Sequence, residues 1–167
     1  MHISTGVRGV PFATATAGNI IRIFGKDNKL YTGMKVYREN YKAALYLQSH
    51  PIFGMAEIAE WHEEQGLILE APEAVLLCNE FTQMPYGHAP ATGDLAIHDD
   101  GKTTLLAKMN DSPWYVDMGT GQLFLPNEGR KPTIKVSKWS IVLKADTKEC
   151  LVEFPSLCKS SQVQRPT

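Results

Sequence analysis

The chain has 167 residues, of which 43% are hydrophobic and 21% are charged, and its formal net charge is −1 at pH 7. These values lie in the ordinary range of globular proteins and exclude wholesale disorder. A chain of this length can form one domain with a buried core, and no apolar run approaches the roughly 20 residues of a membrane-spanning helix.

The two ends of the chain have the composition of extended segments. Residues 1–19 combine glycine and proline with an Ala–Thr alternation, which predicts an extended N-terminal arm lying on a surface. Residues 158–167 have a similar character and predict a C-terminal tail. Between them we expect a single domain over residues 20–157. If the arm is packed into the fold instead, deleting residues 1–17 should lower the thermal midpoint markedly.

The domain begins with a predicted β-hairpin, in which Ile20–Phe24 and Leu30–Tyr37 flank a loop at residues 25–29. A helix is predicted after this hairpin. Asn40 is a suitable N-cap for it, and apolar residues recur at helical spacing until Pro51 ends the pattern.

A second helix is predicted over residues 54–65, because apolar and acidic side chains separate onto opposite faces at about 100° per residue. Pro72 suits the first position of a third helix that runs through Phe81. A buried strand at Val75–Cys78 is the alternative for this last segment.

Three further hairpins are predicted where alternating apolar residues flank turn sequences. They join Leu95–Ile97 to Thr103–Met109, Trp114–Asp117 to Gln122–Leu125, and Ile134–Leu143 to Glu149–Phe154. A slip in the apolar alternation predicts a β-bulge near Ser137–Lys138. These elements predict an α+β fold, in which two or three helices are inserted after the first hairpin and an antiparallel sheet follows them.

Charge is distributed unevenly along the chain. Residues 55–129 carry thirteen acidic and two basic side chains, whereas the basic side chains are in excess by seven to two over residues 1–54 and by eight to three over residues 130–167. Like charges on one surface repel each other unless an opposite surface faces them. This distribution therefore predicts contact with a protein partner, either a second copy or another subunit.

The acidic helix predicted over residues 54–65 is the expected contact surface. A tryptophan falls among its glutamates and can supply the apolar anchor that interfaces usually contain. The predicted interface residues are Glu57, Glu60, Trp61, Glu64 and, from the arm, Phe12. Alternatively, Trp61 packs beneath the sheet and the glutamates are solvated.

Chemical motifs are sparse in this sequence. His88, Asp94 and His98 could form an oxygen-and-imidazole metal site. The alternative is that the neighbouring aspartates shape a turn while His98 faces solvent. No nucleophile and base occur at a spacing specific for catalysis, so we expect no catalytic residue and no cofactor. The predicted second and third helices contain no Lys or Arg, which disfavours nucleic acid as a partner.

These observations favour a non-enzymatic structural or interaction protein, a subunit of a larger assembly such as a virus particle or another multiprotein complex. One alternative is a small metal-dependent hydrolase built on His88, Asp94 and His98. Another is an inhibitor whose acidic surface mimics nucleic acid and occupies a basic protein site. Three cysteines far apart in the sequence and the lack of a secretion-signal pattern predict a cytoplasmic location, or assembly into a particle made there.

Overall fold

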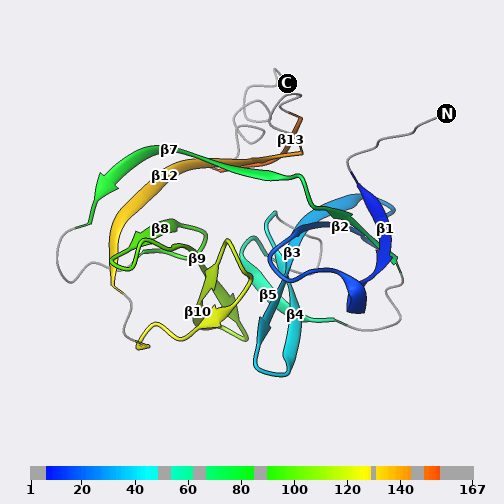
Figure 1. The fold of residues 1–167 in the computed structure, drawn as a ribbon, viewed down its shortest axis with the longest axis horizontal. Coiled ribbons are helices and arrows are strands. Elements are labelled where there is room, and N and C mark those ends of the chain that lie inside the picture. Colours follow the sequence, from blue (N-terminus) through cyan, green and yellow to red (C-terminus); the bar gives the residue numbers. More distant parts are fainter. Residues whose placement is uncertain are drawn as a thin grey trace, which may run out of the picture.

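The computed structural model describes residues 7–48, 54–61, 67–84, 90–128, 131–143 and 149–154. Within these ranges the chain forms β-strands and one short 3-10 helix at Phe12–Thr14 (Figure 1). The strands are β1 (Arg8–Pro11), β2 (Ile20–Phe24), β3 (Leu30–Arg38), β4 (Tyr41–Tyr46), β5 (Glu57–Glu60), β6 (Leu67–Ala71), β7 (Val75–Gln83), β8 (Leu95–His98), β9 (Thr103–Met109), β10 (Ser112–Asp117), β11 (Leu123–Phe124), β12 (Pro132–Val142) and β13 (Cys150–Phe154).

The strands belong to one hydrogen-bonded sheet. Its main path runs β1-β6-β2-β3-β4-β5-β9-β8-β12-β13, while β7 pairs with β12 and β10 pairs with both β9 and β11. Four hairpins predicted from the sequence are confirmed by the antiparallel pairs β2–β3, β8–β9, β10–β11 and β12–β13. The long strands β7 and β12 lie side by side at the top of Figure 1.

Part of the sheet closes on itself. The chain of pairs β3–β4–β5–β9–β10–β11 returns to β3 through a parallel bridge between Tyr37 and Gln122. The amide of Tyr37 also donates to the Gly121 carbonyl at 2.9 Å. These strands therefore form a closed cylinder, in which one face of each strand points to a common interior.

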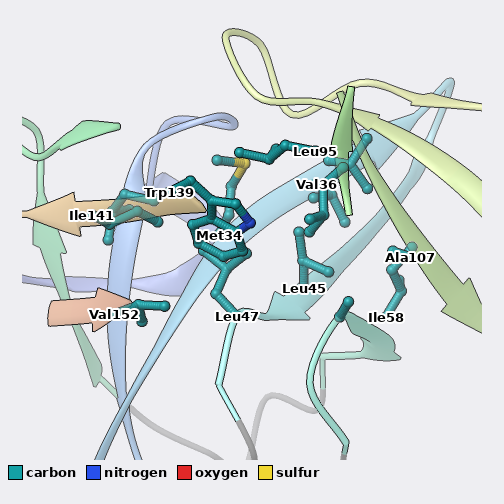
Figure 2. Close-up of a cluster of buried hydrophobic side chains, with 14 of the residues drawn as sticks. Met34, Val36, Leu45, Leu47, Ile58, Leu95, Ala107, Trp139, Ile141 and Val152 are labelled. Atoms are coloured by element: carbon teal, nitrogen blue, oxygen red, sulfur yellow. The ribbon is translucent and has the colours of Figure 1, made fainter. Parts of the chain in front are cut away.

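The interior of the cylinder is continuous with the main hydrophobic core. Side chains from the cylinder strands meet those of β12 and β13 in one cluster, as Figure 2 shows for Val36, Leu45 and Trp139. A second, smaller cluster lies on the opposite face of the same sheet and includes Ile21 and Tyr46. Strands β2 and β4 contribute to both clusters and are thus covered on both faces.

The predicted α+β fold is wrong, because the segments expected to be helical are strands. The first expected helix is β4, whose residues alternate between the two clusters: Ala43 and Leu45 enter the main core, and Ala44 and Tyr46 enter the smaller one. A strand that is apolar on both faces loses the alternation that identifies a strand in a sequence. Its apolar run then resembles a helix.

The other two expected helices fail for related reasons. The segment expected as a helix over residues 54–65 contains β5, in which Ile58 faces the main core and Ala59 faces the smaller cluster. Pro72 lies in a turn closed by the Ala74 amide, which donates to the Ala71 carbonyl at 3.1 Å. The alternative strand at Val75–Cys78 is the correct type, and it extends to Gln83 as β7.

The β-bulge predicted near Ser137–Lys138 is not found in the pairing of β12 with β7, although the phase slip that suggested it is present. Val136 and Trp139 are both buried, yet the register with β7 is unchanged from Val136↔Phe81 to Lys138↔Asn79. On β7 the slip is matched by Glu80, whose φ is 57°. Both strands therefore change phase at the same level.

None of the described residues belongs to a helix long and apolar enough to cross a membrane.

Candidate functional site

One end of the strand cylinder opens into a surface groove of about 490 Å³. The residues that line it are Arg38, Glu39, Tyr41, Glu60, Met109, Asn110, Trp114 and Leu123, and we call it the hairpin-tip groove. Two tight turns border it, one between β3 and β4 and the other between β9 and β10.

The strands position these side chains by simple alternation. Most groove residues lie two positions from a buried residue of the main core on the same strand, and so share its face. These pairs are Arg38 and Val36, Tyr41 and Ala43, Glu60 and Ile58, Met109 and Ala107, and Trp114 and Val116. The groove is therefore the open end of the core, where polar and amphipathic side chains replace aliphatic ones.

Arg38 is the central charge of the groove. Its guanidinium donates to both carboxylate oxygens of Glu128 at 2.7 and 3.0 Å, and it lies over the Trp114 ring, 5.2 Å from the centroid. A two-point pair of this kind fixes the plane of the guanidinium. The hydrogen bond to Glu128 raises the pKa of Arg38 above its ordinary value, so this group is a permanent cation.

A second hollow of about 500 Å³ adjoins the first and shares Arg38, Glu39 and Leu123 with it. Phe124 and Glu128 line its far side. Arg38 therefore borders both depressions, and its partner Glu128 borders the second. A partner that lies across both depressions would contact this ion pair.

Tyr41 lines the groove beside Arg38, its partner in the β3–β4 pairing. Its hydroxyl donates to the Met109 sulfur at 3.4 Å, and its side chain is 37% exposed. Burial, followed by the negative charge of Glu60, raises the pKa of the phenol, so Tyr41 stays neutral and its ring stays electron-rich. Tyr41 thus presents an aromatic surface beside a carboxylate.

The groove is acidic. Glu39, Glu60 and Glu128 line the two hollows, and among the described lining residues Arg38 is the single opposing charge. Carboxylates next to aromatic rings suit a cationic ligand, because ammonium and guanidinium groups interact favourably with both. A lysine or arginine side chain is the matching protein group.

The turns that border the groove hold unusual backbone conformations. Glu39 has φ 52°, and Asn110 and Asp111 have φ 49° and 64°. Asparagine and aspartate adopt this left-handed region readily in hairpin turns, whereas glutamate does so seldom. Such conformations often occur beside binding surfaces, where the surrounding structure holds them in place.

The predicted interface residues do not share one face. Glu60 lines the groove, while Trp61 lies on the other side of the sheet and stacks on Phe12 with ring centroids 4.3 Å apart. Glu57 is half-buried and accepts the Gly54 amide at 2.8 Å. Glu64 lies outside the described residues. Since β5 is a strand, the acidic helical stripe that joined these side chains in the prediction does not exist.

The predicted metal residues are held by other partners. Asp94 accepts the Ala91 amide at 2.8 Å and lies 3.3 Å from the Lys135 ammonium. His98 is buried with Nε2 2.5 Å from the Thr104 hydroxyl, and four residues of extended chain separate it from Asp94 by roughly 13 Å. His88 lies outside the described residues. Within the described part of the chain, no three candidate ligand side chains gather in one place.

Sequence reasoning missed most of the groove. It identified Glu60, but Arg38, Trp114 and Glu128 come together only through pairings between distant strands. Arg38 and Glu128 are 90 positions apart in the sequence. Comparisons with protein-family models, with curated proteins and with solved structures found no match to this chain.

Proposed function

We propose that this chain is a non-enzymatic interaction protein, a subunit of a larger assembly, and that the hairpin-tip groove binds a basic segment of a protein partner. The observation that supports this most is the placement of Arg38, Tyr41 and Trp114 among three carboxylates at the open end of the core. Tryptophan, tyrosine and arginine are the residues most enriched at the energetic centres of protein interfaces.

The groove offers separate contacts for the charge and the stem of a basic side chain. A lysine ammonium placed between Tyr41 and Glu60 would contact an electron-rich ring and a carboxylate, while its methylene stem would lie against Met109. The Arg38–Glu128 ion pair is already formed, so little side-chain entropy is lost there on binding. Because the attraction is partly electrostatic, binding should weaken as ionic strength rises.

The charge distribution along the sequence supports the same partner class. Two of the three carboxylates, Glu60 and Glu128, come from the acidic middle segment, and a basic partner surface would complement them. A second copy can supply such a surface from its basic terminal segments, as can a different subunit.

The proposal can be tested with a fluorescein-labelled tetralysine peptide, whose binding is followed by fluorescence anisotropy. The purified full chain should bind it, and the double variant Glu39→Gln with Glu60→Gln should bind at least several-fold more weakly, since both carboxylates are lost while the fold is kept. Glu153→Gln, on the exposed side of β13, is the matched control and should bind as the wild type does. Equal affinity in all three proteins would remove the groove as the binding surface.

A further inference from the structure

The N-terminal residues 8–16, which we call the strap, cover the smaller hydrophobic cluster. Within the strap, β1 pairs antiparallel with β6, from Arg8↔Glu70 to Pro11↔Leu67. Phe12 and Ala15 then insert side chains into the cluster, where Phe12 stacks on Trp61. The strap is thus an extended peptide added to the edge of β6, a common mode of peptide recognition.

A buried lysine forms hydrogen bonds with the main chain of the strap. The Lys35 ammonium, on β3, donates to the carbonyl oxygens of Phe12, Ala13 and Ala15 at 2.9, 3.1 and 2.8 Å. The residue is only 4% exposed, and its ammonium lies 5.1 Å from the centre of the Phe12 ring. All three donors of the ammonium are therefore used, and they fix a bend that a straight strand does not have.

A buried carboxylate accepts hydrogen bonds from two further groups of the strap. Glu70, which has no exposed surface, accepts the Thr16 amide at 2.8 Å and the Arg8 guanidinium at 2.8 Å. It also accepts the Asn19 side-chain amide at 2.9 Å. Burial by itself would raise the pKa of Glu70, but these hydrogen bonds outweigh it and lower the pKa, so the carboxylate is ionised when the strap is docked.

The groups that hold the strap form a complete acceptor site. Lys35, Glu70, Trp61 and the edge of β6 recognise main-chain atoms, one aromatic ring and one guanidinium, all of them within residues 8–16. The strap is joined to β2 through Ala17, Gly18 and Asn19, and Gly18 has φ 87°, a conformation from which the chain direction can change.

We propose that this acceptor site also takes the strap of a second copy of the chain, so that two copies exchange straps. The occupant is defined by the site itself, since the Phe12 ring, the three carbonyls and Arg8 of the strap contact Trp61, Lys35 and Glu70 respectively. The contacts are the same whichever copy supplies the strap, and exchange then depends on chain concentration relative to the effective concentration of the tethered strap. This surface is separate from the hairpin-tip groove, and the proposal does not depend on it.

Cysteine cross-linking of full-length chains tests this exchange. Gly9 and Leu69 face each other in the β1–β6 pair, and a side chain at Gly9 meets no atom within 4 Å. In chains whose native cysteines are replaced by alanine, the double variant Gly9→Cys with Leu69→Cys should close an internal disulfide. This verifies that the two positions can be bridged and that the strap is docked.

The decisive sample is an equimolar mixture of the single variants Gly9→Cys and Leu69→Cys, incubated at high concentration before mild oxidation. Strap exchange predicts a disulfide between the two chains, formed about tenfold more than in a control mixture of Gly9→Cys with Lys42→Cys, and increasing with concentration. A yield no higher than in the control mixture, while the double variant closes fully, would overturn the proposal.

Discussion

Replacing Lys35 by methionine tests whether the buried ammonium holds the strap. Methionine keeps most of the apolar stem but removes the donors to the carbonyls of Phe12, Ala13 and Ala15, of which the first and last hydrogen bonds are buried. Each buried carbonyl left without a donor costs about 1–3 kcal/mol. Burial of the ammonium, which lowers the pKa of Lys35, is relieved in the variant and offsets part of this loss. We therefore expect the free energy of unfolding to fall by about 3 kcal/mol.

Urea unfolding followed by circular dichroism measures this change, and a thermal scan should show a midpoint lower by about 6–12 °C. Lys42→Met is the matched control, because Lys42 is exposed on the neighbouring strand β4, and its effect should stay within about 0.5 kcal/mol. If Lys35→Met is as stable as the wild type or more stable, desolvation of the ammonium outweighs its hydrogen bonds. The account of the strap would then be refuted.

Three further predictions concern stability. Among the described residues no group hydrogen-bonds the buried Thr32 hydroxyl, so Thr32→Val should stabilise the protein by about 1 kcal/mol in urea unfolding. Gly121→Ala should destabilise it by about 2–4 kcal/mol, since φ is 77° and the new Cβ would lie 2.6 Å from the Lys35 carbonyl oxygen. Glu70 has a lowered folded pKa, so its contribution should be complete above about pH 4.3 and be lost as the pH falls through the folded value. Glu70→Gln should flatten this acid limb of the pH–stability curve.

The hairpins could be predicted because their signals are local. Asp100 and Gly101 form the turn between β8 and β9, and alternating residues flank them on both sides. The register of such a hairpin follows from the turn and from the pattern beside it. Distant strands are not needed to recognise these elements.

Strands β4 and β5 could not be predicted, because their environment is set by distant parts of the chain. Ala44 and Tyr46 are buried in the smaller cluster, to which the strap contributes Phe12 and Ala15. Ala59 is packed against the same cluster. When both faces of a strand are buried, its sequence lacks the alternation of apolar and polar residues that identifies a strand. The glutamates of β5 then resemble the acidic face of a helix.

The candidate groove could not be predicted from the sequence for the same reason. Tyr41 and Met109 touch across 68 sequence positions. Neither residue belongs to a sequence motif, and nothing in the sequence distinguishes either one from an ordinary strand residue. Strand β5 brings them together, because it pairs with β4 on one side and with β9 on the other. The charge asymmetry that predicted a partner was readable from the sequence, but the surface carrying it was not.

The three tryptophans provide the most direct test of the proposed binding surface, because the structure places each in a different environment. Trp114 lines the hairpin-tip groove, Trp61 lies beneath the strap and Trp139 is buried in the main core. Two-dimensional NMR of the indole N–H groups during titration with unlabelled tetralysine peptide should shift the Trp114 signal and leave the signals of Trp61 and Trp139 in place. A stationary Trp114 signal at saturating peptide, or a shift confined to Trp61, would contradict the assignment of partner binding to this groove.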